Sequence, residues 1–444
     1  MNTDFYLDEV RDGYLVTSAY KKLWAVQLDL LQQFDAFCKK HGLKYFAQGG
    51  TLLGVARYKG YIPWDDDIDL IMLWDDYKVL LREGPAFFKE PYFLQNYLTE
   101  KEGEPQLSKL RRSNTTGCTK WEEECVTPAF NKGIFIDIFP LFNVPDDETE
   151  RLKQIEKISY YWKLYKGYEV NREKQLNNGV SKLESKYDDY EKMYLTCFPR
   201  LSFREIKRRY IETCSVIESR TKYVAPLAFR ANNPKTTWPR EWFDETIMLP
   251  FEDILLPCPK QYISMLDHQY GNWRIPVQNG AIHEMSMFDT ETSYIDKMHI
   301  DLTPRPIIRA YESDDFDSLN ELLGITYGSN ITKEELEKYC ITENRIILVS
   351  VLNDNTVVGC AFISINQDYV RKGKNAFVTY VAVSESMRHN RIGTHLFVEI
   401  EKIAKLYDCT SIELTSANHR AEAHAFYKAL SFTKKQTTVF IKEI

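Results

Sequence analysis

Four aspartates occupy five positions of this sequence, at residues 65, 66, 67 and 69, and an apolar run follows them at once. Side chains alternate along a strand with period two, so Asp67 and Asp69 would share one face while Ile68 and Leu70 face a core. Carboxylates held side by side repel each other unless a cation lies between them. Oxygen-rich sites of this kind suit Mg²⁺ or Mn²⁺. We therefore interpret Asp67 and Asp69 as metal ligands; a charged turn before a strand is the competing interpretation.

A third acid, Asp137, stands in the middle of an apolar strand expected over residues 133–140. A carboxylate buried there without a partner would cost on the order of several kcal/mol. A structural ion pair would satisfy it. A role beside Asp67 and Asp69, as a further metal ligand or as a base, explains the pattern better.

The residues before the acids predict the elements that position them. A helix is expected over residues 20–41 and a short strand over residues 44–47, followed by the pair Gly49-Gly50 and a helix that opens at Thr51. Such a turn permits close approach of the backbone and points free N–H groups at an anion. Adjacent glycines are common in turns, so the pair is informative mainly because the acidic run follows it.

Composition limits the class of protein. A length of 444 residues predicts about two or three domains, and 44% hydrophobic with 27% charged residues is typical of a globular protein. The net charge of −7 argues against a nucleic-acid partner. Nine cysteines without a CxxC pair indicate a reduced compartment. No signal peptide or long apolar stretch is visible, so we expect a cytoplasmic protein, with contact at the inner face of a membrane left open.

Two domains are expected, over residues 1–300 and 305–444. The first should contain a helical insertion at about 148–222, and His283 near its end is interpreted as a structural or surface residue. A change of character near Pro304 and Pro306 indicates a linker. Beyond it the predicted strands are 346–352, 357–365, 376–383, 411–415 and 437–442, and the predicted helices are 315–323, 391–406 and 421–430. The expected fold class is α/β (α+β), with a mixed sheet in the first domain.

The first part of the chain resembles the LicD family, which is related to fukutin-type proteins. The residues that carry the resemblance are Gly49-Gly50-Thr51-Leu52-Leu53-Gly54, Arg57, the run from Gly60 to Asp69, the run from Gly133 to Leu141, and Tyr270-Gly271-Asn272-Trp273. The resemblance implies a nucleotidyltransferase-like fold and transfer of a phospho-alcohol, such as phosphocholine from CDP-choline or a related CDP-alcohol, to a glycan hydroxyl.

Within that resemblance, Asp67, Asp69 and Asp137 match the acids that hold the metal. Mg²⁺ would then lie across the donor's pyrophosphate, because phosphoryl transfer depends mostly on positioning and charge neutralisation. Asp65 and Asp66 are expected to support the ligands. The groups expected to hold the donor's phosphates are the backbone of Gly49, Gly50 and Thr51 and the side chains of Arg57, Lys109 and Arg111.

The last part of the chain resembles the GNAT acyltransferases. Residues 380–383 lead into Arg388-His389-Asn390-Arg391-Ile392-Gly393-Thr394, which is similar to the acyl-CoA pyrophosphate loop at a helix N-terminus. Arg391 stands where the first glycine of that loop is usual. The resemblance implies acetyl-CoA bound along Val381, Val383, Arg388, Arg391, Gly393, Thr394 and Asn418, and Tyr427 as general acid. Glu413 and a water-relayed base both stay open as the base.

Joining the two resemblances implies two decorations of one surface glycan or lipid-linked oligosaccharide. Two alternatives stay open at this point. One is a nucleotidyltransferase that acts on a sugar or sugar phosphate with an NTP. The other is a glycan-binding scaffold with an inactive GNAT domain. The sequence leaves the donor head group, both acceptors and the oligomeric state undecided.

Overall fold

A computed structural model describes residues 3–100, 105–120, 122, 130–176, 187–197, 201–277, 285–298, 306–340, 342, 344–352, 355–369 and 373–436. The chain divides into two compact units. The first comprises Met1–Leu176, Ser185–Tyr190 and Phe203–Thr303, and the second comprises Asn177–Glu184, Glu191–Ser202 and Pro304–Ile444. Three expected features lie outside the described residues: His283, the linker before Pro306 and the strand at 437–442.

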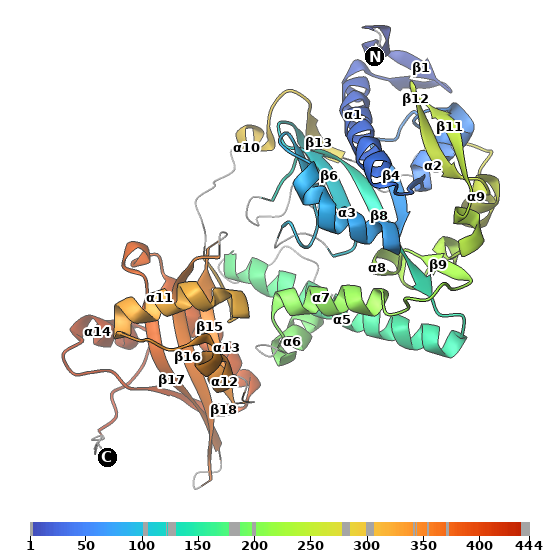
Figure 1. The fold of residues 1–444 in the computed structure, drawn as a ribbon. Helices are drawn as coiled ribbons and strands as arrows, with labels where there is room; N and C mark the ends of the chain where they lie inside the picture. The colour runs from blue at the N-terminus through green and yellow to red at the C-terminus, as the bar shows by residue number, and fades with distance from the viewer. Residues whose placement is uncertain are drawn as a thin grey trace. The chain divides into compact units, whose positions relative to one another are not determined.

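The first unit is built on a seven-stranded sheet (Figure 1). Its central strand, β8 (Ile134–Val144), runs parallel to β4 (Asp69–Leu73) on one side. On the other side β8 pairs antiparallel with β6 (Ser108–Arg112) near its start and with β9 (Tyr223–Ala225) near its end. The sheet is completed by β3 (Phe46–Ala47), β5 (Tyr92–Gln95) and β10 (Trp238–Pro239).

Helix α1 (Ser18–His41) packs against β8 and β6. Its buried side chains recur at helical spacing, and Gly42 ends it in the left-handed conformation with φ of 67°. This confirms the predicted helix and its stop signal. Helix α2 (Gly49–Tyr58) begins at the glycine pair, and α3 (Trp74–Phe87) follows β4 directly.

Smaller elements surround this core. The hairpins are β1 (Glu9–Arg11) with β2 (Tyr14–Val16), and β11 (Thr246–Phe251) with β12 (Ile254–Pro259). Strand β7 (Thr116–Thr119) pairs with β13 (Met285–Asp289). The helices are α5 (Glu148–Leu176), α7 (Phe203–Cys214), α8 (Leu227–Arg230), α9 (Tyr262–Tyr270) and α10 (Tyr294–Lys297), and α6 (Asp188–Cys197) spans the division between the units. The expected helical region is therefore present as α5, α6 and α7.

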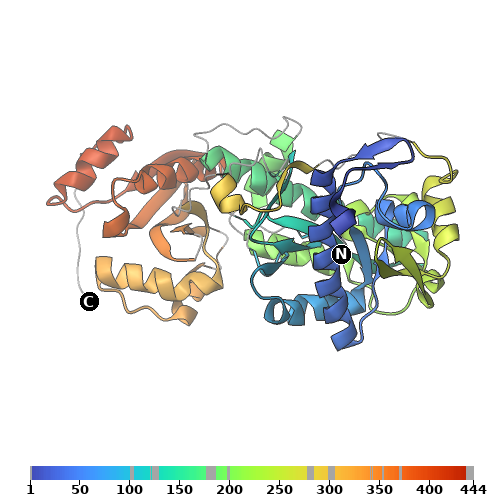
Figure 2. The ribbon, with the colours of Figure 1, turned by 90° about the horizontal axis from the view of Figure 1, so that it is seen from above.

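The second unit contains a five-stranded sheet in the order β14-β15-β16-β17-β18. The strands are β14 (Ile307–Ala310), β15 (Arg345–Val351), β16 (Val357–Asp368), β17 (Gly373–Val383) and β18 (Cys409–Leu414), and only β17 and β18 run parallel. Helix α11 (Phe316–Tyr327) packs Leu319 and Leu323 on one face of the sheet. Figure 2 shows α13 (Ile392–Leu406) on the other face. Helices α12 (Lys333–Cys340) and α14 (Ala421–Ala429) complete the unit.

The helices of the structure were compared with the length and apolarity that a membrane span requires. Among the described residues, no helix is long and apolar enough to span a bilayer.

Candidate active sites

The first candidate site begins with a row of three residues across the sheet of the first unit. Asp69 on β4 lies opposite Asp137 on β8, and Asp137 lies opposite Lys109 on β6. Residues directly opposite each other project from the same face of a sheet. The Lys109 Nζ atom lies 2.8 Å from Asp137 Oδ1. Strand pairing thus brings together two acids and a cation that the sequence separates by up to 68 positions, from 69 to 137.

Strand β4 begins at Asp69, so Asp67 lies in the loop before it rather than on the strand. The loop is held by its own backbone. Helix α1 donates from Trp24 Nε1 to the Asp65 carbonyl at 2.9 Å and from Gln27 Nε2 to the Asp66 carbonyl at 2.7 Å. These two donors stand one helical turn apart, so the helix orients the acidic loop through the loop's backbone carbonyls.

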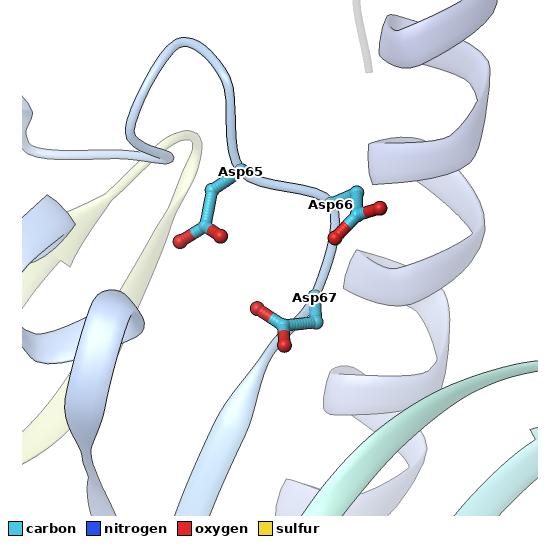
Figure 3. Close-up of side chains that lie close together, drawn as sticks. All are labelled: Asp65, Asp66 and Asp67. Carbon is cyan, nitrogen blue, oxygen red and sulfur yellow. The ribbon is translucent and has the colours of Figure 1, made fainter. Parts of the chain in front are cut away.

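The three acids of this loop form the tightest carboxylate cluster among the described residues. One oxygen of each of Asp65, Asp66 and Asp67 lies within 4.8 Å of the others. Figure 3 shows the Asp65 and Asp67 carboxylates on the same side of the loop and that of Asp66 turned away. Asp66 Oδ2 accepts a hydrogen bond of 2.5 Å from the backbone N–H of Met285. The Asp65 carboxylate therefore faces the same space as that of Asp67, although only a supporting role was expected for it. The Asp66 carboxylate instead binds the Met285 backbone.

The glycine pair at the start of α2 allows the acids to approach the helix. A Cβ atom on Gly49 would lie 2.9 Å from Asp69 Oδ2, and one on Gly50 would lie 2.5 Å from Asp65 Oδ2. Gly49 also has φ of +60°, which other residues rarely adopt. Thr51 accepts the backbone N–H of Asp69 at 2.8 Å through its hydroxyl. The turn thus fixes the acids against the helix N-terminus.

Burial and mutual repulsion disfavour the charged form of these carboxylates and so raise their pKa values. Burial, with the charge of Asp137, raises the pKa of Asp67 to about 7 although Lys109 opposes the shift. Burial and the charges of neighbouring aspartates also raise the pKa of Asp65 and of Asp69 well above the usual range. A hard divalent cation takes oxygen ligands of this kind, and it would offset both burial and repulsion. The donor set therefore suits Mg²⁺ or Mn²⁺. The oxygens that lie close together belong to Asp65, Asp66 and Asp67, so Asp65 joins the predicted ligands Asp67, Asp69 and Asp137 as a residue that could hold the cation.

The two predicted cations of β6 have different surroundings. Lys109 lies beside Asp137 and over the Phe135 ring, 3.7 Å from its centroid. Arg111 is fully buried, and its guanidinium pairs with Glu122 and donates to Gln95 and to the Gly133 carbonyl. Arg111 therefore departs from its expected role at the donor phosphates, because its donors already serve protein groups.

Arg57 is partly engaged by the protein through its Nη2 atom, while its buried Nε has no hydrogen-bond partner among the described residues. Its guanidinium donates to the carbonyl oxygens of Trp273 and Ile275. It therefore ties the end of α2 to the segment after α9. That segment contains the Tyr270-Gly271-Asn272-Trp273 motif, so Arg57 holds the motif beside α2.

Two further residues of the site were not predicted from the sequence. Tyr270, at the end of α9, is partly exposed, and burial together with the charges of Asp69 and Asp65 raises its pKa, which Arg230 partly lowers. Arg230 ends α8, beside Phe229, whose ring contacts that of Phe139 at 5.1 Å. No described carboxylate forms an ion pair with Arg230. The motif around Tyr270 was a signal for the tyrosine; nothing in the sequence singled out the arginine.

The second candidate site lies in the second unit, at β17 and the start of α13. Val381 and Val383 end β17, and Arg388 follows within an exposed segment, 3.3 Å from Glu385. Arg391 has φ of 58° and precedes α13, whose first turn contains Gly393 and Thr394. Arg391 thus adopts the conformation for which glycine is favoured at this position.

The two remaining predicted residues of this site, Asn418 and Tyr427, come later in the chain. Asn418 lies in the loop between β18 and α14. The half-buried Tyr427 ring on α14 contacts Phe397 of α13 at 5.7 Å. Burial raises the pKa of Tyr427, and Arg420 opposes the shift. A neutral phenol is the form that a general acid requires.

Two separate stretches of the chain match known protein families. Residues 42–155 match the family described as LicD/FKTN/FKRP, nucleotidyltransferase domain, and residues 316–432 match the acetyltransferase (GNAT) family. The chain thus carries a LicD domain and a GNAT domain. Both are transferase families, which indicates an enzyme.

Relatives of the LicD domain cover a short stretch. A 77-residue stretch is 49% identical to the lipopolysaccharide cholinephosphotransferase LicD of Haemophilus influenzae, over 17% of this chain and 28% of that protein. A 58-residue stretch is 38% identical to an uncharacterized protein of Rickettsia prowazekii, over 13% and 22% of the two chains. The matched stretches thus span less than a third of the length of these curated relatives.

Several solved structures similar to part of this chain are described as acetyltransferases. One is an acetyltransferase of Trypanosoma brucei, 21% identical, covering 31% of this chain and 100% of that one with a TM-score of 0.29. Another is the glucosamine-6-phosphate N-acetyltransferase of Arabidopsis thaliana, 20% identical over 31% of this chain and 98% of that one, also with a TM-score of 0.29.

Proposed function

We propose that the LicD domain transfers a phospho-alcohol from a CDP-activated donor to a hydroxyl of a surface glycan or of its lipid-linked precursor. The observation that carries the proposal is the buried carboxylate set against the glycine turn of α2. Asp69, Asp137 and Lys109 stand side by side across three strands there, and the charges of Asp67 and Asp137 act on Asp69. The cholinephosphotransferase activity named for the Haemophilus influenzae relative supports phosphocholine as the transferred group.

In the proposed reaction, the acceptor oxygen bonds to the phosphorus of the phospho-alcohol and the bridging P–O bond of the donor breaks. CMP leaves, and the acceptor hydroxyl gives up its proton. Asp67, Asp69 and Asp137 would hold a divalent cation, which would supply charge neutralisation for the pyrophosphate. Alternatively, Asp137, whose Oδ1 lies 2.8 Å from Lys109 Nζ, accepts the hydroxyl proton as a general base.

The chain offers two further groups to the donor. Arg230 is exposed, and a guanidinium can bind phosphate oxygens with two parallel hydrogen bonds. Tyr270 lies within reach of the acids' charge and presents a hydroxyl that can donate. We assign to these two residues the phosphate-binding role that the sequence suggested for Arg57 and Arg111.

For the GNAT domain we propose transfer of an acetyl group from acetyl-CoA to an amine. The amine nitrogen bonds to the acetyl carbon, the C–S bond breaks, and the sulfur takes the proton of Tyr427. The amine loses one proton to a base, and we assign no side chain to this role. The left-handed Arg391 before α13 supports this proposal, because it keeps the backbone shape of a pyrophosphate loop.

One assay tests the first proposal and its main rival. The protein is mixed with Mg²⁺ and, separately, with CDP-choline, CDP-ethanolamine or CTP, and the released nucleotide is identified. Release of CMP from a CDP-alcohol in the presence of an acceptor glycan supports phospho-alcohol transfer. Release of pyrophosphate from CTP with a sugar phosphate supports nucleotidyl transfer, which the same carboxylates can perform. Absence of both would contradict catalysis by this site.

A further inference from the structure

An exposed aromatic corner stands on β17, immediately before the segment expected to bind acetyl-CoA. Tyr380 is 57% exposed and has φ of 50°, an unusual conformation for a tyrosine. Its ring contacts the ring of Tyr327 on α11 at 5.5 Å and 84°, and that of Phe362 on β16 at 5.5 Å and 73°. These edge-to-face contacts fix the orientation of the exposed ring.

The corner is anchored to the irregular part of the sheet. The register between β16 and β17 shifts between Cys360 and Phe362, so that Tyr380 and Val381 of β17 together face Ala361, which indicates a bulge in β17 at Tyr380. The Tyr327 hydroxyl donates to the Val381 carbonyl at 2.7 Å, and the Cys360 thiol donates to the Tyr380 carbonyl at 3.4 Å. Bulges and residues with positive φ are concentrated next to active sites. The aromatic corner is therefore placed rigidly at the edge of the acyl-CoA segment.

A single cation joins the corner to Tyr427. The Arg420 guanidinium lies over the Tyr327 ring, 5.8 Å from its centroid. Its charge acts on the hydroxyls of both Tyr327 and Tyr427. Arg420 is exposed, and no described carboxylate forms an ion pair with it. The charge beside the expected general acid is thus positive and available to a ligand.

These surroundings select the charge of an acceptor. Arg420 would repel a polycationic amine, because like charges repel and no described carboxylate forms an ion pair with Arg420. A phosphate or carboxylate would be bound with charge-assisted hydrogen bonds. The tyrosine rings offer apolar faces with polar edges to the carrier of the amine. A guanidinium nearby also favours the uncharged, nucleophilic form of the amine.

We propose that Tyr327, Tyr380 and Arg420 form the acceptor subsite of the GNAT domain, and that it takes a primary amine whose carrier bears a phosphate or carboxylate. This inference rests on the proposed acetyl transfer. It excludes polyamines and unmodified basic peptides as preferred acceptors. An amino sugar phosphate belongs to the class that it selects.

The test compares two probes that differ only in the anion, glucosamine and glucosamine 6-phosphate, with the full chain. Binding is measured by calorimetry in the presence of saturating CoA, and acetylation by release of the CoA thiol. Wild type should bind the phosphorylated probe at least about tenfold more tightly, because a hydrogen bond to a charged group contributes a tenfold factor or more. Arg420→Gln should remove this preference, and Arg420→Lys should restore part of it. Lys428→Gln, which removes an exposed charge on the same helix, should leave it unchanged.

Three results would overturn the inference. One is equal binding of both probes by wild type. A second is an unchanged preference in Arg420→Gln. The third is a large loss of CoA affinity in Arg420→Gln with no anion binding in CoA-saturated wild type, which would assign Arg420 to the CoA phosphates. Failure of wild type to bind CoA at all would instead contradict the proposed acetyl transfer, so the two failures are distinguishable. Tyr380→Leu tests the aromatic part and should raise the KM of the acceptor without changing the KM of acetyl-CoA.

Discussion

The two candidate sites of this chain differ in the sign of the charge that they present: carboxylates dominate the first and arginines the second. The LicD site gathers carboxylates with Lys109 paired to Asp137, so under the proposed function a metal would have to offset their charge before a phosphate could approach. The GNAT site presents Arg388, Arg391 and Arg420 from exposed backbone, and such cations bind phosphates directly. This difference in charge matches a difference between the two proposed reactions. Attack at phosphorus needs charge neutralised at the reacting atoms, whereas in acetyl transfer the phosphates are only a handle.

The strongest test of the LicD site compares Arg111→Met with Lys109→Met, two matched substitutions on one strand. Arg111→Met leaves Glu122 buried without its partner, so the free energy of unfolding should fall by about 3–5 kcal/mol. Lys109→Met should lower the rate of CMP release while changing stability far less. Chemical denaturation together with the nucleotide assay measures both. Equal stability of the two variants would show that Arg111 is not structural.

Asp67→Asn should separate the two activities of the chain. CMP release should fall by about a hundred- to a thousandfold, the loss typical of a removed electrostatic contact in a transition state, and acetyl transfer should persist. Asp75→Asn, which alters an exposed acid paired with Lys78, is the matched control. Both activities are measured on one preparation. Parallel loss of both would mean that the substitution unfolds the protein, and full retention would remove Asp67 from the metal site.

Tyr427→Phe makes the reciprocal test on the GNAT site. The phenol ring stays against Phe397 while the proton for the sulfur is lost, so kcat should fall by about a hundredfold, with the KM of acetyl-CoA little changed. Release of the CoA thiol measures the effect, and CMP release serves as the internal control. Unchanged acetyl transfer would show that another group protonates the sulfur.

Replacing a glycine by alanine in each site should show how far the neighbouring atoms can move to accommodate a methyl group. In Gly50→Ala the new methyl would meet a carboxylate oxygen of Asp65 at 2.5 Å. That oxygen cannot move without disturbing Asp67, so transfer should fall by about tenfold, comparable to one weakened hydrogen bond. In Gly393→Ala the methyl meets the Phe426 ring at 3.0 Å, and a ring can tilt, so the loss should be smaller. The reverse order would contradict the view that the carboxylate site is the more rigid of the two.

The local sequence was sufficient for the main elements. The helical spacing before Gly42 predicted α1 and its end, and the apolar run with one acid predicted β8. The start of β4 was less clear, because the loop that contains Asp67 is held by α1 side chains far away in sequence. The pairing partners of β8 could not be read from its own residues, because pairing depends on which strands the tertiary fold brings alongside.

The candidate acids follow from residue type and spacing alone. Asp67, Asp69 and Asp137 were identified because carboxylates in or beside apolar strands need a partner. Only the tertiary structure distinguishes the roles of Lys109 and Arg111. They stand two positions apart on one face of β6, so period and charge make them equivalent. What distinguishes them is the protein that covers Arg111: Glu122, Gln95 and the Gly133 carbonyl take up its donors, while Lys109 remains beside Asp137.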